Sequence, residues 1–132
     1  MPQTTTVPPT TSTFVHTELV SDDVQATRDF FTRTFRWTFE DTTAPGAPPY
    51  TFVRDGRGNS FGGLRPVDDD EPGPAVVDYI GVEDVDATAR TVEQNGGTIL
   101  VPVQAVGGLG RMFVFEAPGG TVFGCWQDTT PR

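Results

Sequence analysis

The sequence predicts an α+β fold built from two tandem βαβββ modules. Three observations predict it: an internal repeat, the order of segments within each half, and a strand-rich composition. Residues 14–66 align on residues 75–127 at a constant shift of 61 without a gap. Eleven aligned pairs are identical, where about five are expected by chance. Valine, threonine and phenylalanine outweigh leucine and isoleucine, which favours strands over helices.

The first module opens with a strand over residues 14–20, where β-branched and aromatic residues predominate. Asp22 and Asp23 then offer N-cap acceptors to a helix. The helix is indicated by residues that recur at helical spacing: Val24, Thr27, Phe31 and Phe35. Three more strands are expected over 36–41, 49–55 and 59–66, separated by proline- and glycine-containing turns.

The second module repeats this order. A strand over 76–82 is followed by Asp84 as N-cap. The second helix is marked by Val85, Ala89 and Val92 and ends at Asn95-Gly96-Gly97, where a left-handed residue needs no Cβ. The remaining strands are expected over 97–103, 111–117 and 120–127. Outside the modules we expect a flexible Thr/Pro-rich tail (1–13), an acidic linker (67–74) and a C-terminal tail (128–132).

Composition excludes several classes of protein. The single cysteine, Cys125, rules out a disulfide framework. No apolar run approaches the roughly 20 residues of a membrane span, and the first residues lack the features of a secretory signal. We therefore expect a cytoplasmic protein with no membrane partner.

The chain is strongly acidic, with 18 acidic and 9 basic residues and a net charge of −9. Such a surface repels phosphate, so we expect no nucleic-acid partner. The charge could attract a cationic ligand to a cleft, or it could reflect solubility or adaptation to high salt. The acidic residues are scattered along the chain, which favours the second interpretation.

Paired βαβββ modules with these segments resemble the vicinal oxygen chelate superfamily, which includes glyoxalase I, extradiol dioxygenases and bleomycin-binding proteins. The resemblance covers residues 14–127. It rests on four stretches: residues 16–19 with Asp23 and Phe30-Phe31, residues 35–37, residues 79–87, and Gly110-Arg111 with residues 116–120. It implies a cup-shaped curved mixed sheet with the helices outside, and a homodimer.

In the superfamily, metal ligands come from positions that correspond here to His16, Gly63, Val77 and Gly124. Only His16 has a side chain that can bind a metal, whereas a metal site needs about three protein ligands. We therefore expect no metal cofactor. The alternative is a site in which His16 and Glu18 recruit a third ligand from a partner subunit.

Strand alternation predicts the lining of the cup. If His16 faces the cup, Glu18 faces it by alternation and Tyr79 by the repeat. Counting two residues onward from Gly63 and from Gly124 adds Arg65 and Trp126. The glycines are expected to leave room for a ligand. Polar groups among aromatic ones are typical of a small-molecule pocket.

Several roles remain open for these residues. Glu18 could act as a general base or pair with Arg65. Arg111 stands where the superfamily often has a basic residue, and is a candidate to bind an anionic group. Cys125 precedes Trp126 on the same strand, so its side chain points away from the cup. We therefore expect a buried, inert thiol.

The preferred function is binding of a small organic molecule, aromatic or cationic, without a metal. The candidate ligand-binding residues are His16, Glu18, Arg65, Tyr79, Arg111 and Trp126. The alternative is a metal-dependent lyase, isomerase or dioxygenase on the same scaffold, with His16 and Glu18 as catalytic candidates. A third possibility is a protein whose dimer interface is its function.

Overall fold

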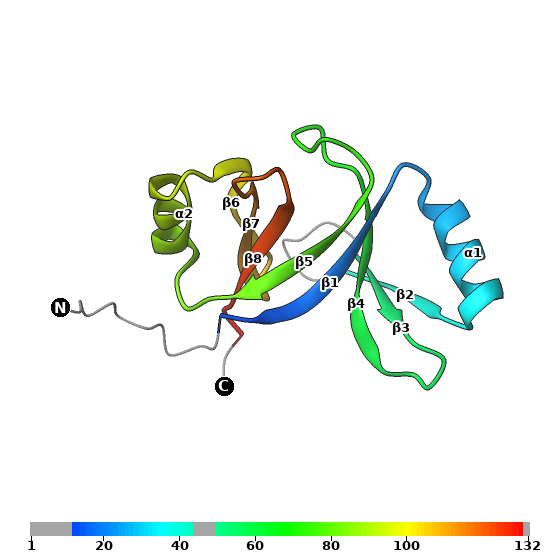
Figure 1. The fold of residues 1–132 in the computed structure, drawn as a ribbon. Coiled ribbons are helices and arrows are strands. Elements are labelled where there is room, and N and C mark those ends of the chain that lie inside the picture. Colours follow the sequence, from blue (N-terminus) through cyan, green and yellow to red (C-terminus); the bar gives the residue numbers. More distant parts are fainter. Residues whose placement is uncertain (1–11, 44–49, 131–132) are drawn as a thin grey trace.

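The computed structural model describes residues 12–43 and 50–130, which form one curved eight-stranded mixed sheet and two helices (Figure 1). The first half contains β1 (Phe14–Ser21), α1 (Val24–Phe35), β2 (Thr38–Thr42), β3 (Tyr50–Arg54) and β4 (Ser60–Pro66). The second contains β5 (Ala75–Gly81), α2 (Val85–Gln94), β6 (Thr98–Val106), β7 (Gly110–Glu116) and β8 (Val122–Asp128). The predicted α+β fold is confirmed. Most of the tail predicted over 1–13 lies outside the described residues.

The two halves meet at the centre of the sheet, whose strand order is β2-β3-β4-β1-β5-β8-β7-β6. Strand β1 runs parallel to β4 and antiparallel to β5. Thr17 lies opposite Asp78, exactly one repeat length along the chain, and donates a 2.6 Å hydrogen bond to it. A pseudo-two-fold axis therefore passes through this pair.

Aspartate caps start both helices, as the sequence predicts. The side chains of Asp23 and Asp84 accept hydrogen bonds from the backbone of residues 26 and 87, at 3.0 and 3.1 Å. Helix α1 ends at Phe35, and its C-cap residue, Arg36, adopts a left-handed conformation with φ 63°. This cap explains why β2 begins at Thr38 and not at residue 36, where the pattern placed it.

The repeat does contain a shift in the third strand of each module, contrary to the gapless alignment. Phe52 lies opposite Gly63, whereas its aligned residue Phe113 lies opposite Cys125. An irregularity beside Val53 in the pairing of β3 with β4 shifts these two strands by one residue relative to the equivalent pair, β7 and β8. Since a one-residue slip reverses the side on which a residue lies, Phe52 and Phe113 face opposite sides of the sheet.

The sheet has an outer face, on which the helices lie, and an inner face. Helix α1 packs on β2 and β4, and α2 on β6, β7 and β8, so the helices flank β1 and β5 (Figure 1). The outer core consists of one cluster under each helix, and the inner core of a third cluster: Val20, Val77, Tyr79, Val101 and Val114. Neither helix in the described part of the chain is long and apolar enough to cross a membrane.

Candidate functional site

A buried carboxylate lies at the centre of the inner face. Glu18, on β1, is only 5% exposed. Its Oε1 accepts hydrogen bonds from Tyr79 Oη at 2.7 Å and from Arg65 Nε at 2.5 Å. Its Oε2 accepts one from Tyr50 Oη at 2.6 Å. Three donors on three other strands thus surround one carboxylate, and charge-assisted bonds of this kind are among the stronger ones in proteins.

Arg65 connects this carboxylate to the acidic linker. Its Nη1 and Nη2 donate to the two carboxylate oxygens of Glu71 at 2.5 and 2.8 Å, and the Glu71 side chain is only 2% exposed. Burial alone would lower the pKa of Arg65, but the bonds to Glu71 and the charge of Glu18 raise it well above its usual range. Arg65 therefore remains a cation between two buried acids.

His16 extends the network toward the edge of the buried cluster. Its Nε2 lies 2.9 Å from Tyr50 Oη. Because the single Tyr50 hydroxyl proton is donated to Glu18, the histidine must be the donor in this contact. Burial lowers the pKa of His16, opposed in part by the charge of Glu18. The neutral ring then carries its proton on Nε2 and presents Nδ1 as an acceptor, which has no hydrogen-bond partner among residues 12–43 and 50–130.

The two tyrosines act as neutral donors. Burial, followed by the charge of Glu18 and the hydrogen bonds to it, raises the pKa of Tyr50 and of Tyr79 well above the ordinary value of 10. Removing either proton would place a phenolate against the carboxylate that it stabilises.

The two glycines do not leave the room that the sequence predicted. A Cβ on Gly63 would lie 1.8 Å from Tyr50 Oη, and one on Gly124 would lie 2.3 Å from Cε2 of Tyr79. The tyrosine rings therefore fill the space above both glycines. Tyr79 lies directly opposite Gly124 on the neighbouring strand, so its large ring covers the position that has no side chain.

The structure brings most of the predicted residues together, but not all. His16, Glu18, Arg65 and Tyr79 form the network described above, and the predicted Glu18–Arg65 ion pair is present. Trp126 lies on the same inner face, partly exposed, and packs against the inner core.

Arg111 is separate from this group. Its side chain donates to Asp86 of α2 at 2.6 Å, which places it on the outer face. Cys125 is also on the outer face, 2% exposed, and burial raises the pKa of its thiol to about 12. This placement agrees with the buried thiol expected from strand parity.

Sequence reasoning missed two members of the network, Tyr50 and Glu71. Residues two positions apart on a strand lie on the same face, so Tyr50 lies on the same face as Phe52. This alternation is the signal from which Tyr50 could have been found. Glu71 follows three aspartates in a segment that reads as a solvated acidic linker, and nothing local distinguishes it from its neighbours.

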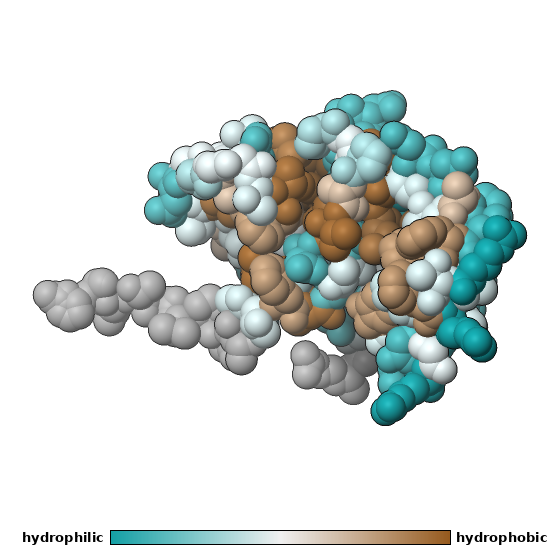
Figure 2. Space-filling view, turned by 45° about the vertical axis from the view of Figure 1, so that its right-hand side comes forward, coloured by the Kyte–Doolittle hydropathy of each residue, from teal (hydrophilic) through white to brown (hydrophobic). Residues whose placement is uncertain are grey.

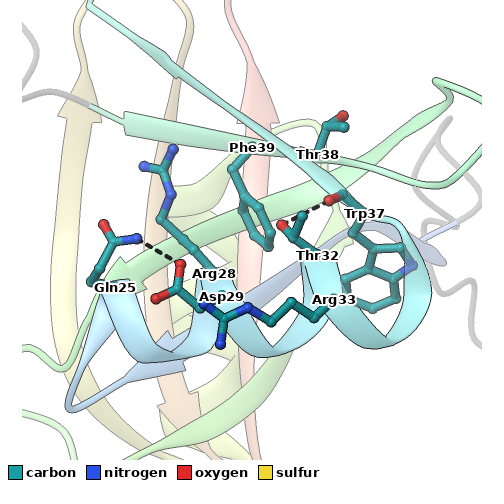
Figure 3. Close-up of a pocket in the computed structure, with 8 residues that line it drawn as sticks. All are labelled: Gln25, Arg28, Asp29, Thr32, Arg33, Trp37, Thr38 and Phe39. Carbon is teal, nitrogen blue, oxygen red and sulfur yellow. Dashed lines mark hydrogen bonds between the residues drawn. The ribbon is translucent and has the colours of Figure 1, made fainter.

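Two shallow hollows lie on the outer face, away from Glu18. The larger, of about 370 Å³, lies between α1 and β2 (Figure 3). Arg28 and Arg33 extend from the helix on either side of it, and the rings of Trp37 and Phe39 form part of its wall. The smaller, of about 260 Å³, lies beside α2. Neither includes a residue of the Glu18 network.

The superfamily's metal does not fit the residues at the corresponding positions. Val77 is buried and has no donor atom, and tyrosine rings cover Gly63 and Gly124. Both oxygens of Glu18 already accept hydrogen bonds. Among residues 12–43 and 50–130, no three His, Cys, Asp or Glu side chains are grouped as metal ligands would be.

Comparison with known proteins identifies the family. The sequence profile of the glyoxalase/bleomycin resistance protein/dioxygenase superfamily matches residues 13–124, so the chain belongs to this superfamily. It is 36% identical over 123 residues to the anthracycline biosynthesis protein DnrV of Streptomyces peucetius. That match covers 83% of this chain but 45% of DnrV, so the chain spans less than half the length of this curated relative.

Solved structures show the same fold at low sequence identity. Methylmalonyl-CoA epimerase of Mycobacterium tuberculosis superposes with a TM-score of 0.57 and 13% identity, over 88% of this chain and 87% of the epimerase. The Mn(II)-bound glyoxalase of Novosphingobium aromaticivorans superposes with a TM-score of 0.55 and 19% identity, over 90% of this chain and 40% of the glyoxalase. At these identities the likeness concerns the fold.

Proposed function

We propose that this protein binds a small, planar aromatic organic molecule on the inner face of the sheet, without the metal of its superfamily. The observation that carries the proposal is the filling of the superfamily's ligand positions by Tyr50 and Tyr79, both held by Glu18. These contacts convert the centre of the inner face from an open coordination site into a rigid, hydrogen-bonded floor.

Partly exposed side chains around this floor suit an aromatic ligand. Tyr50, Phe52 and Trp126 are only half-buried, and the ring of Tyr50 lies 5.1 Å from that of Phe52 in an edge-to-face arrangement. Aromatic rings of a ligand pack well against such groups. Nδ1 of His16 adds one acceptor, which can bind a hydroxyl or ammonium group of the ligand.

Relatives give the ligand class further support. The name of DnrV connects that protein with anthracyclines, which are planar and aromatic. A methylmalonyl-CoA epimerase of Streptomyces coelicolor has been solved with 2-nitronate-propionyl-CoA, which shows that the fold can hold an organic ligand. We further propose that the protein acts as a homodimer, and the cytoplasmic location expected from the sequence remains a prediction.

A fluorescence titration tests the proposed function. The probe is an anthracycline that carries an amino sugar, so that one compound presents both a planar aromatic system and a cation. We expect saturable quenching with one site per chain and no consumption of the probe. His16→Ala and Phe52→Ala should each weaken binding by about tenfold, because each removes one contact of roughly 1.4 kcal/mol.

The matched control is Leu109→Ala, which removes an exposed apolar side chain from the turn between β6 and β7. It should leave the affinity unchanged. Non-saturable quenching, or equal affinity in the wild type and both inner-face variants, would contradict the proposal. Turnover of the probe that depends on added metal would support the enzyme alternative.

A further inference from the structure

The larger of the two hollows on the outer face brings charged and aromatic side chains together. It lies between α1 and β2, and we refer to it as the α1–β2 hollow. Its volume of about 370 Å³ is within the range of about 300–1,000 Å³ that is typical of small-molecule pockets. Figure 2, in which the α1 side of the molecule is turned forward, shows hydrophobic and strongly hydrophilic surface next to each other on this side. Such a surface can contact a ligand that is partly apolar and partly charged.

The aromatic wall of the hollow is held in place by its own contacts. The Trp37 indole stacks on Phe31, with ring centroids 4.5 Å apart and an angle of 8° between the rings, and contacts Phe61 edge-to-face at 4.7 Å. The Trp37 carbonyl accepts a 3.0 Å hydrogen bond from Thr32 Oγ1, which ties the start of β2 to α1 (Figure 3). Trp37 is still partly exposed. A fixed, partly exposed indole offers a surface on which a flat ring can pack without first ordering a side chain.

The two arginines of the hollow differ in what they contact. Nη1 of Arg28 donates to both carboxylate oxygens of Asp41, at 2.8 and 3.0 Å, and the guanidinium carbon lies 5.6 Å from the centre of the Phe39 ring. Arg28 is therefore fixed. Arg33 is exposed, and its guanidinium has no hydrogen-bond or ion-pair partner among residues 12–43 and 50–130. Since a guanidinium presents its donors in a planar fork that matches a carboxylate, Arg33 is the group in the hollow that is available to an anion.

An acidic side chain, Asp29, also lines the hollow. Its Oδ1 accepts a 2.9 Å hydrogen bond from Gln25 Nε2, one helical turn earlier (Figure 3). Asp29 and Arg33 are four positions apart, and residues at this spacing are neighbours on a helix surface, yet no ion pair joins them. The charge of Arg33 is therefore not cancelled by a direct contact, although Asp29 reduces the attraction of the hollow for an anion.

The second half of the chain shows that the fold does not require these side chains. At the repeat shift of 61, the two arginines and the two rings align with residues that are neither charged nor aromatic: Ala89, Gln94, Thr98 and Leu100. Helix α2 packs on β6 and β7 without them. Among the described residues, the hollow beside α2 is lined by no charged side chain. The arginines and rings thus distinguish the α1–β2 hollow from its counterpart, which favours a ligand over a role in packing the helix.

We propose that the α1–β2 hollow binds a small aromatic carboxylate. The ring packs against Trp37 and Phe39, and the carboxylate forms a bidentate ion pair with Arg33. A guanidinium and a carboxylate match in both charge and shape, and such pairs are among the stronger hydrogen-bonded contacts in proteins. Arg28, held beside Phe39, adds a second positive charge to the hollow. The hollow contains no residue of the Glu18 network, so this site does not depend on the ligand of the inner face.

Titration with benzoate, followed by two-dimensional NMR of the nitrogen-15-labelled full chain, tests this site. The chain has two tryptophans, Trp37 and Trp126, so two indole N–H signals are expected, and the variant Trp126→Phe identifies the Trp37 signal as the one that remains. We expect the Trp37 signal to move saturably, with a Kd on the order of 1 mM or below, as for other very small ligands. Benzamide, which keeps the ring without the charge, should bind at least about tenfold more weakly.

Variants of the charged residues separate a contact with Arg33 from a general effect of charge. Arg33→Gln should weaken benzoate binding about tenfold, and Arg33→Lys about threefold, because lysine keeps the charge but not the planar fork. Asp29→Asn should tighten binding about threefold, since it removes a negative charge from the lining. The matched control, Arg90→Gln, removes the same charge from an exposed position on α2 and should have no effect.

Three results would overturn the inference: a Trp37 signal that does not move, equal affinity for benzoate and benzamide, or binding that Arg33→Gln leaves unchanged. A shift of the Trp126 signal alone would assign benzoate to the inner face and would also overturn it. The same spectra show whether each variant is folded, so that loss of binding is not confused with loss of structure.

Discussion

The substitution Gly124→Ala directly perturbs the packing that defines the site. A Cβ at this position would lie 2.3, 2.4 and 2.8 Å from three atoms of the Tyr79 ring, whereas carbon atoms in contact are normally about 3.5–4.0 Å apart. The ring must therefore move by more than about 1 Å. Tyr79 is only 3% exposed, and its hydroxyl lies 2.7 Å from Glu18, so the ring cannot move without losing this hydrogen bond.

The expected loss of stability has two parts. Forcing an extra methyl group into a packed core costs about 1–3 kcal/mol. Breaking a buried hydrogen bond to a charged group costs about 1.5–3 kcal/mol more. Together these give a decrease of about 2.5–6 kcal/mol in the free energy of unfolding. Gly63→Ala should cost less, about 1.5–3 kcal/mol, because the half-buried Tyr50 can turn toward solvent and avoid most of the overpacking, although its hydroxyl then loses the hydrogen bond to Glu18.

Urea denaturation followed by tryptophan fluorescence measures these values. Gly108→Ala is the control, since no atom lies within 4 Å of its added Cβ, and it should change stability by less than about 0.5 kcal/mol. In a Tyr79→Ala background, Gly124→Ala should also have little effect, because the ring that it displaces is absent. A cost for Gly124→Ala equal to that of Gly108→Ala would refute the packing described here.

Two further predictions concern protonation. Tyr50 and Tyr79 are the only tyrosines in the chain, and the pKa values of both are raised. The folded protein should therefore show no phenolate absorbance at 295 nm near pH 10, where exposed tyrosines are half ionised. Tyrosine ionisation with a midpoint near pH 10 in the folded protein would contradict the network. Burial lowers the pKa of His16 below 6.5, so below pH 6.5 the unfolded chain binds a proton that the folded chain does not. Stability should therefore fall as the pH drops from about 6.5 toward the lowered pKa. His16→Gln, which can keep the donor to Tyr50, should remove this part of the pH dependence, and an unchanged urea-midpoint profile would count against it.

The sequence was sufficient for the architecture because each element had a local signal. Asp23 and Asp84 mark helix starts at equivalent positions of the repeat, and both are observed as N-caps. The gapless alignment failed at Phe52 and Phe113 because an irregular pairing beside Val53 shifts the register. Such a shift depends on the hairpin geometry, which identical residues in an alignment do not reveal.

The site was predicted in part. Alternation along strands placed Glu18, Arg65 and Tyr79 together, because parity is a local property. It could not show that Tyr79 would cover Gly124, since that depends on the distance between neighbouring strands. Nor could it place Glu71, whose side chain is buried by its pairing with Arg65 of β4 and not by any local pattern of apolar residues. Arg111 lies on the outer face with Asp86, because strand β7 turns its odd-numbered residues toward α2.

We propose that the tyrosines over Gly63 and Gly124 replace the metal of the superfamily. The most direct measurement is the metal content of protein purified without chelators and without a metal-binding tag, before and after incubation with Fe, Mn, Zn or Ni. We predict far less than one metal ion per chain in both cases. A metal content close to one ion per chain, reduced in the variant His16→Ala, would contradict this proposal. It would show that the inner face retains a coordination site.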